Sequence, residues 1–275
     1  MEPKLGALPK ESGILYSQYE RRHVAAEQCV AVHGLTYLVT GSLQVSQAAN
    51  KQVFQAGSLL FSRKNFLAKF TKLPTANGPF RAITVVFDHD LLSAFSQAAG
   101  WGSSPPAGSS PAVQPVPHTP ALAHLYETLR ASFDEPLSPA LTRERQQQTL
   151  GLLLQAQPAL QKVLFDFGQP GKIDLETFMR QHFRFNLEAK QLAYLTGRSL
   201  AAFKRDFKQL FQTSPLRWLY QQRLAEAHYL LQQENRRPSE VYQEVGFESL
   251  AHFSHAFKQL FGYPPSHIRP ASMPR

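Results

Sequence analysis

One helical segment occurs twice in this chain, and this repeat limits the folds that the chain can adopt. Residues 199–215 read SLAAFKRDFKQLFQTSP, and residues 249–265 read SLAHFSHAFKQLFGYPP. In both copies apolar side chains recur every three or four residues, which predicts a helix with one buried face. The residues predicted to be buried are Leu200, Phe203, Phe207, Leu210 and Phe211 in the first copy and Leu250, Phe253, Phe257, Leu260 and Phe261 in the second.

A shorter helix and a glycine-containing turn are predicted before each copy, in the segments NLEAKQLAYLTGRS and PSEVYQEVGFES. We expect Asn186 and Ser239 to be N-caps. We expect Gly197 and Gly246 to adopt the left-handed backbone conformation of a tight turn. A helix, a tight turn and a basic second helix are typical of the helix-turn-helix, whose second helix enters the major groove of DNA. The alternative is two helical hairpins within a bundle.

The face opposite each apolar stripe is basic and carries small residues, which allows close approach to a large polyanion. These residues are Ala201, Ala202, Lys204, Arg205 and Lys208 in the first copy and Ala251, His252, Ser254, His255 and Lys258 in the second. Residues 172–275 hold 15 Lys and Arg against nine Asp and Glu, so they supply +6 of the net charge of +9. Double-stranded DNA is therefore the predicted partner.

Between the two copies, residues 215–233 read PLRWLYQQRLAEAHYLLQQ, which predicts one helix of about five turns. A rigid helix of this length could hold two recognition helices about 34 Å apart, so that one chain reads two successive major grooves. Arg223 and Glu226 lie three residues apart on this helix, and we expect a surface ion pair between them. The alternative is that both contact DNA.

The front of the chain has a different pattern. From about Val30 to Phe87 apolar residues alternate with polar ones in short runs separated by turn residues, which predicts about six antiparallel strands in a barrel or sandwich. The stretch 100–120 is rich in proline, glycine and serine and is predicted to be a mobile loop. Helices are predicted at about 121–132 and 141–155.

The expected fold class is α+β: an N-terminal antiparallel β-barrel of cupin-like type with a helical dimerisation pair, then an all-α domain of two helix-turn-helix units joined by a long helix. The dimer contact is expected on the leucine stripe Leu150, Leu153 and Leu154. The expected division is a sensing barrel at 1–99, a loop at 100–120, a helical dimerisation segment at 121–166 and a DNA-binding domain at 172–270.

Three stretches of the C-terminal part resemble the AraC/XylS family of bacterial transcription regulators. They are LAYLTGRSLAAFKRDFK (192–208), SPLRWLYQQRLAEAHYLL (214–231) and VGFESLAHFSHAFKQLFGYPPSHIR (245–269). The TLGLLL helix and the short β-rich front are closer to the ExsA-like branch. The resemblance implies a DNA-binding regulator with a sensing barrel, a homodimer, and an activator that contacts RNA polymerase. The effector is either a small molecule or a protein such as an anti-activator.

The resemblance also implies residue roles. Base edges are expected to face Ala201, Lys204, Arg205, Ala251, Ser254 and His255. Phosphates are expected to contact Ser199, Lys208, Arg217, Ser249 and Lys258. Lys204 and Arg205 are the strongest base readers, because Lys and Arg donate to guanine O6 and N7. His255 stands where many relatives carry Arg, and Tyr242 where they carry a small residue, so the second unit is expected to bind DNA more weakly.

An enzyme is not expected, and the alternative in that class is a cupin-type catalyst fused to a DNA-binding domain. His23, His33, Glu27 and His89 raise the question of a cupin metal site, but they lack the close histidine pair that such a site needs. The stretch FDHD, residues 87–90, is better explained as a helix cap before Leu91, Leu92 and Phe95. No GxSxG, HExxH, phosphate loop or CxxC motif occurs, so no metal or cofactor is expected.

The remaining expectations concern the compartment. Cys29 is the single cysteine, so no intramolecular disulfide can form; this fits a cytoplasmic protein, and we expect the thiol to be buried. No stretch approaches the roughly 18 apolar residues that span a bilayer, so neither a membrane partner nor export is expected.

Overall fold

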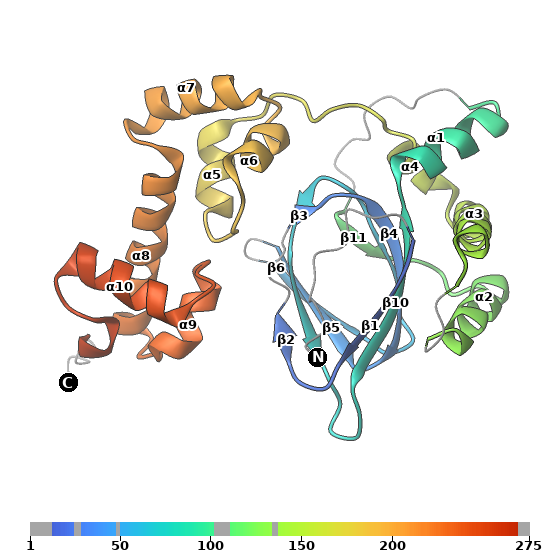
Figure 1. Ribbon diagram of the computed structural model, residues 1–275, viewed down its shortest axis with the longest axis horizontal. Coiled ribbons are helices and arrows are strands. Elements are labelled where there is room, and N and C mark those ends of the chain that lie inside the picture. Colours follow the sequence, from blue (N-terminus) through green and yellow to red (C-terminus); the bar gives the residue numbers. More distant parts are fainter. Residues whose placement is uncertain (1–12, 25–28, 48–49, 102–110, 134–136, 269–275) are drawn as a thin grey trace. The chain divides into compact units, whose positions relative to one another are not determined.

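The computed structural model describes residues 13–24, 29–47, 50–101, 111–133 and 137–268 (Figure 1). The chain divides into two compact units, Met1–Gly168 and Gln169–Arg275. Within the described residues, no helix is both long enough and apolar enough to cross a lipid bilayer.

The first unit is built on antiparallel strands. These are β1 (Ile14–Tyr19), β2 (His23–Val24), β3 (Cys29–Val30), β4 (His33–Thr40), β5 (Ser42–Gln47), β6 (Asn50–Gln55), β7 (Leu59–Ser62), β8 (Phe66–Leu67), β9 (Lys69–Leu73), β10 (Phe80–Phe87) and β11 (Val113–Pro115). One sheet has the order β1-β10-β4-β7-β11, a second has the order β2-β9-β5-β6, and β3 pairs with β8. The predicted antiparallel sheet domain is confirmed. Strand β1 lies upstream of the region where strands were expected.

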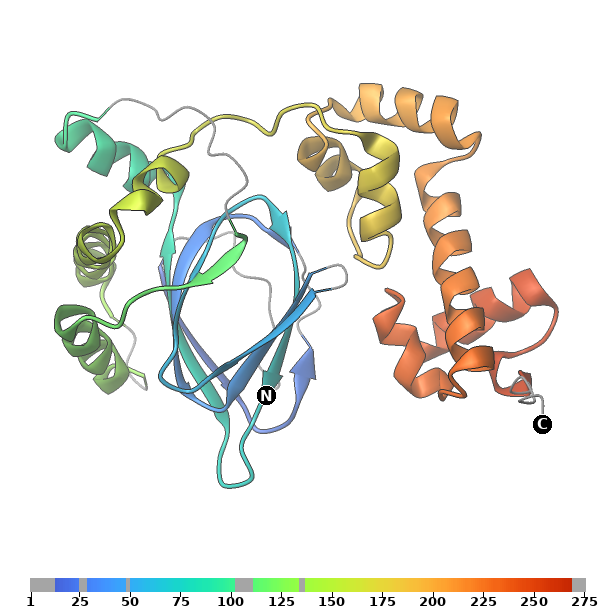
Figure 2. The ribbon, with the colours of Figure 1, turned by 180° about the vertical axis from the view of Figure 1, so that it is seen from behind.

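Four helices accompany the sheets: α1 (His89–Ala98), α2 (Pro120–Ala131), α3 (Pro139–Ala156) and α4 (Gln161–Leu164). Successive strand residues point to opposite faces, so they feed two cores. Leu35 on β4 and Phe61 on β7 pack with the helices, whereas Leu38 and Leu60 pack with the second sheet. Figures 1 and 2 show from opposite sides that α2 and α3 cover the outside of the first sheet.

The leucine stripe of α3 belongs to this internal core, and its assignment to a dimer contact is corrected here. Leu150 and Leu153 are 0% exposed and Leu154 is 9% exposed. The same face of α3 carries Gln146, whose Nε2 donates to the carbonyl of Val86 at 2.5 Å. Because these leucines are buried within their own chain, they have no surface to offer a second copy.

The predicted loop at 100–120 contains an edge strand. β11 pairs with β7, Ala112 and Val113 are buried, and the N–H of Val116 donates to the carbonyl of Leu59 at 2.8 Å. A three-residue strand is too short to show a period, so composition alone suggested a loop. Residues 102–110 lie outside the described residues.

The structure contains the predicted helix cap before Leu91, but Cys29 is less buried than predicted. Asp88 caps α1, because its Oδ1 accepts the Leu91 N–H at 2.7 Å. Cys29 is half-buried rather than buried. No cluster of three or more His, Cys, Asp and Glu side chains that could hold a metal occurs in the part of the chain that the structure describes, which does not include Glu27.

The second unit is helical, with α5 (Leu175–His182), α6 (Ala189–Leu195), α7 (Leu200–Phe211), α8 (Pro215–Gln233), α9 (Pro238–Glu244) and α10 (Leu250–Phe261). The pairs α6–α7 and α9–α10 are the two helix-turn-helix units, and α8 joins them (Figure 1). Trp218 and Leu219 on α8 pack into the core of the first helix-turn-helix, and Leu224 and Ala227 pack into that of the second helix-turn-helix.

Both predicted N-caps of the short first helices are wrong. Helix α6 begins after Glu188 instead of Asn186, and the backbone N–H of Glu188 donates to Oε1 of Gln191 at 2.9 Å. Helix α9 begins at Pro238 instead of after Ser239. Proline favours the first helical position because it has no N–H to leave unpaired there, so the helix starts two residues earlier than predicted.

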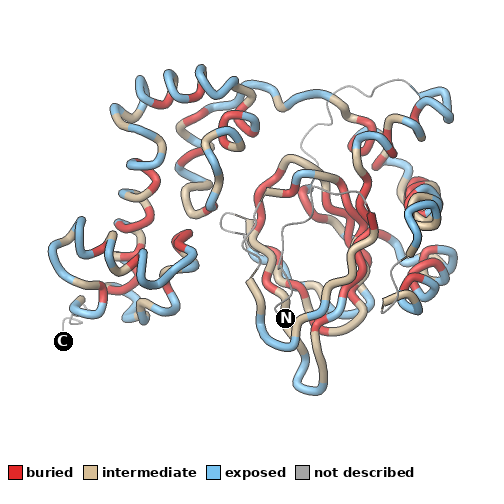
Figure 3. Tube along the Cα trace, in the orientation of Figure 1, coloured by how far each residue is buried: buried red, intermediate tan, exposed pale blue. Residues whose placement is uncertain are grey.

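Only the middle of each predicted apolar stripe is buried. Phe203, Phe207, Phe253 and Phe257 are 0% exposed. The leucines at both ends of the stripes extend beyond the small cores, and Figure 3 shows the alternation of buried and exposed residues along α7 and α10. The exposed fractions are 41% for Leu200, 44% for Leu210, 40% for Leu250 and 45% for Leu260. Phe211 and Phe261 are half-buried.

Candidate DNA-binding surface

The second helix of each unit presents a matching set of side chains to solvent. Ala201, Lys204, Arg205 and Lys208 are exposed on α7, as are Ala251, His255 and Lys258 on α10, while Ser254 is half-buried. The phenylalanines at 203 and 207, and at 253 and 257, fix the rotation of each helix, because they hold the opposite face against the core. The predicted base-reading residues therefore share one face in each helix.

The serines that precede these helices are N-caps. Oγ of Ser199 accepts the Ala202 N–H at 3.2 Å, and Oγ of Ser249 accepts the His252 N–H at 3.4 Å. Capping uses the serine oxygen as an acceptor and leaves its O–H free to donate. Together with the positive end of the helix dipole, this arrangement suits a phosphate oxygen. Arg217 is exposed in the first turn of α8.

Both turn glycines have the predicted left-handed conformation, with φ of +65° at Gly197 and +99° at Gly246. A side chain would also collide with the neighbouring backbone. A Cβ at Gly197 would lie 2.4 Å from the carbonyl of Gly171, and one at Gly246 would lie 2.4 Å from that of Arg184. Each turn therefore requires glycine for its conformation and for its packing.

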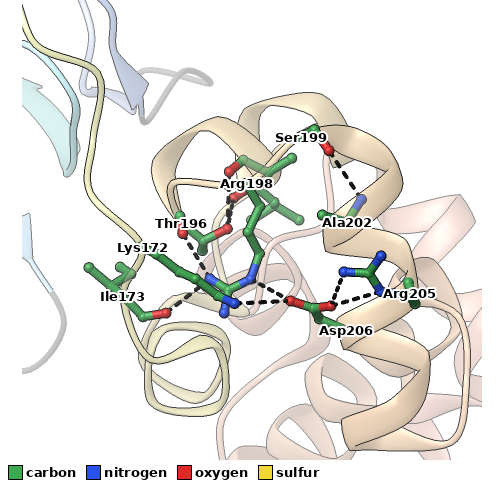
Figure 4. Close-up of polar contacts among 10 residues, drawn as sticks. Lys172, Ile173, Thr196, Arg198, Ser199, Ala202, Arg205 and Asp206 are labelled. Atoms are coloured by element: carbon green, nitrogen blue, oxygen red, sulfur yellow. Dashed lines mark hydrogen bonds and ion pairs between the residues drawn. The ribbon is translucent and has the colours of Figure 1, made fainter.

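Asp206 on α7 gathers three cations, as Figure 4 shows. Its Oδ2 accepts from Nε of Arg198 at 3.2 Å and lies 3.8 Å from Nζ of Lys172. Its Oδ1 accepts from Nη2 and Nε of Arg205 at 3.1 and 3.3 Å. The hydrogen bond from Arg198 in particular lowers the pKa of Asp206, so its carboxylate is charged throughout the physiological range.

Arg223 is a buried contact within the C-terminal unit, between the α5–α6 connection and the second helix-turn-helix, and its predicted surface ion pair with Glu226 is wrong. The residue is 5% exposed. Its guanidinium donates to the carbonyls of Phe183 at 2.7 Å, Phe185 at 2.7 Å and Gly246 at 3.0 Å. Burial lowers its pKa to about 10. Glu226 pairs instead with Arg184.

The two exposed faces differ in charge. Positions 204, 205 and 206 of the first unit hold Lys, Arg and Asp, whereas the matching positions 254, 255 and 256 hold Ser, His and Ala. The lysines at 208 and 258 match. The first helix-turn-helix therefore offers the stronger electrostatic attraction to a polyanion.

Comparison with known proteins agrees with this geometry. The model of a helix-turn-helix domain matches residues 192–271, and the model of the ExsA N-terminal regulatory domain matches residues 33–163. The chain belongs to the AraC/XylS family, in its ExsA-like branch. It is an AraC-type DNA-binding transcriptional regulator, and its relatives are regulators rather than enzymes.

Relatives in this family match most of the chain. The HTH-type transcriptional regulator ExsA of Pseudomonas aeruginosa is 25% identical over 244 residues, which are 86% of this chain and 85% of ExsA. The virulence regulon transcriptional activator VirF of Yersinia enterocolitica is 24% identical over 86% of this chain and 88% of its own. A crystal structure of apo ToxT from Vibrio cholerae strain SCE256 covers 93% of this chain and 96% of its own, at 9% identity and a TM-score of 0.47.

The roles of two residues that support this AraC-type surface were not predicted from the sequence. Asp206 is an acid within a basic helix face, and that contrast was the available signal. Arg223 gave none, because an Arg and a Glu three residues apart occur on many exposed helices and nothing in the pattern marks the Arg as buried.

Proposed function

We propose that this regulator activates transcription by placing α7 and α10 of one chain in two successive major grooves. The base-reading residues are Ala201, Lys204, Arg205, Ala251, Ser254 and His255. The phosphate contacts are Ser199, Lys208, Arg217, Ser249 and Lys258. One observation carries the proposal: two serine-capped helices present corresponding residues to solvent from either end of α8. With 19 residues, α8 is about 28 Å long, which approaches one turn of DNA.

Activation is supported by the relatives, since VirF is named a transcriptional activator. RNA polymerase is then the second macromolecular partner of the DNA-bound chain. The compartment is the cytoplasm, because the chromosome of a bacterium lies there. A homodimer would place four recognition helices on two half-sites, and its contact must use surfaces other than Leu150, Leu153 and Leu154, which are internal.

We regard the N-terminal sheets as a cupin-like barrel. This barrel and the helices of 121–166 form the regulatory part of the chain. A protein partner is favoured over a small molecule for it. Large side chains fill the space between the sheets, among them Leu38, Leu43, Leu60, Phe66 and Phe80. A packed interior leaves little room for a ligand, whereas the outer surface stays available to a protein.

The test is selection of binding sites from a random duplex library by the full-length chain at about 150 mM salt, where non-specific binding is already weakened. We expect two boxes about one helical turn apart. Arg205→Ala should lose about 1–3 kcal/mol at cognate sites and relax preference at one base pair. Lys208→Ala should weaken binding to every duplex equally and lower the salt dependence.

The controls separate the two roles. Arg180→Ala removes an exposed arginine on α5 and should leave the selected sequence unchanged. Equal losses on cognate and random duplex for Arg205→Ala would remove its base-reading role. A wild-type chain that enriches no sequence in the absence or presence of cell extract would contradict the proposal as a whole.

A further inference from the structure

The single acid of α7 is half-buried beside the exposed face and is placed to control how Arg205 meets a base. Asp206 divides its two carboxylate oxygens between an inner and an outer partner. Oδ2 takes Arg198, whose side chain is 8% exposed, and Oδ1 takes Arg205, whose side chain is 75% exposed. The carboxylate is thus fixed from within the protein and in turn holds a side chain that points outward (Figure 4).

The hold on Arg205 leaves one edge of its guanidinium free. Nε and Nη2 both donate to Oδ1 of Asp206, at 3.3 and 3.1 Å. The edge formed by Nη1 and the second N–H of Nη2 points away from these two hydrogen bonds and is the pair of donors that fits O6 and N7 of guanine. An arginine restrained in this way loses less side-chain freedom on binding than a free one.

The inner partner is anchored to the backbone. Nη1 of Arg198 donates to the carbonyls of Ile173 at 2.9 Å and Thr196 at 2.8 Å. Lys172, next to Ile173, adds its ammonium 3.8 Å from Oδ2. The orientation of Asp206 therefore depends on the turn before α7 and on the segment around Lys172 and Ile173 that precedes α5.

The second helix-turn-helix unit has no such arrangement. Ala256 stands at the position of Asp206, and Glu248 at the position of Arg198. If the ion pairs of Asp206 served only to stabilise a helix-turn-helix unit, we would expect them in both copies. Its presence in the unit that carries Lys204 and Arg205 points to a role in reading DNA.

We propose that Asp206 is a specificity-determining positioning residue: it orients Arg205 toward one guanine and keeps that guanidinium from turning to the phosphates. The proposal rests on the proposed function, in which Arg205 reads a base. The negative charge of Asp206 also weakens binding to DNA of any sequence, and since the oriented Arg205 favours only the cognate site, the difference in affinity between cognate and random DNA becomes larger.

The test measures binding of the full-length chain to its selected site and to the three duplexes changed at the base pair that Arg205 reads. Asp206→Asn should reduce discrimination at that base pair about tenfold while binding to random duplex stays equal or becomes tighter. Glu176→Gln is the matched control, because it removes one acid from an exposed pair with Arg180 and should leave discrimination unchanged.

A double-mutant cycle separates positioning from a structural role. In an Arg205→Ala background, Asp206→Asn should have no further effect on discrimination, because its target is gone. Asp206→Glu keeps the charge but moves the carboxylate, and should also reduce discrimination while preserving the thermal unfolding midpoint. Unchanged discrimination in Asp206→Asn would overturn the inference, as would equal losses at every base pair. A wild-type chain without sequence preference would overturn the proposed function as well.

Discussion

At the scale of single residues, burial decides what polar groups of this protein do. His33 on β4 is 1% exposed, and its Nδ1 accepts the backbone N–H of Lys64 at 3.1 Å. The neutral ring therefore carries its proton on Nε2, which is buried without a hydrogen-bond partner among the described residues. Burial, followed by the charges of Lys64 and Arg63, lowers the pKa of His33 to about 3.

This shift predicts an acid-sensitive N-terminal unit. An unfolded histidine has a pKa of about 6.5, so between pH 6.5 and 3 the unfolded chain binds a proton that the folded chain does not. The contribution of His33 to the free energy of unfolding is fully present above pH 6.5. It falls as the pH is lowered, and about 2 kcal/mol of it is lost at pH 5.

The measurement is urea unfolding at pH 7.5 and 5.0, followed by Trp101 fluorescence in a Trp218→Phe background, since these are the two tryptophans. In His33→Asn the amide oxygen can still accept the Lys64 N–H, and about 2 kcal/mol of the acid loss should disappear. If both chains lose the same stability between the two pH values, His33 is not the group responsible.

At the scale of elements, α7 and α10 share an apolar skeleton but not a binding face. The same spacing of phenylalanines sets both helices against their cores. Their outer residues do not take part in that packing, so they can differ: Arg205 on α7 corresponds to His255 on α10, and both are exposed. The inequality of the two helix-turn-helix units thus lies in their exposed side chains and in the Arg198–Asp206 pair behind those of the first.

Replacing His255 on α10 by arginine should strengthen DNA binding. His255 is exposed, so His255→Arg adds a guanidinium without disturbing the core. We expect affinity for the selected site to rise about tenfold and a new preference at one base pair of the second box. His267→Arg, an equally exposed site outside α10, is the control. Equal gains in both variants would show a general electrostatic effect instead of base reading.

At the scale of the whole DNA-binding unit, Arg223 connects the two helix-turn-helix motifs. From α8 it reaches two carbonyls of the α5–α6 connection and the carbonyl of the second turn glycine, Gly246. Three carbonyls share one buried cation, and the compact ammonium in Arg223→Lys cannot span all three as the guanidinium does, so at least one is left unsatisfied. We expect the unfolding free energy to fall by about 3 kcal/mol.

The same substitution should loosen the spacing that the two recognition helices demand. A series of duplexes whose boxes are separated by different numbers of base pairs would measure it. The wild type should prefer one spacing sharply, and Arg223→Lys should bind neighbouring spacings almost as well. Arg180→Lys, on the surface of α5, serves as the comparison. An unchanged spacing optimum in Arg223→Lys would show that α8 alone sets the geometry.

The sequence by itself determined the features that repeat or alternate locally. The duplicated stripe, the two glycines and the alternation from Val30 to Phe87 predicted the helix-turn-helix units, the turns and the antiparallel sheets, because such periods follow from backbone geometry. The base-reading and phosphate-contacting residues were predicted from the same face and from family resemblance, and remain predictions.

Tertiary structure decided whatever depends on what covers a face. An apolar stripe shows that Leu150 and Leu153 will be buried, but not whether a second copy or their own sheet buries them. A three-residue strand such as β11 has no period of its own and forms only because β7 offers an open edge. Arg223 takes its role from carbonyls 23 to 40 residues away in the chain. Asp206 combines two nearby cations, Arg198 and Arg205, with the distant Lys172, and no apolar period predicts such contacts.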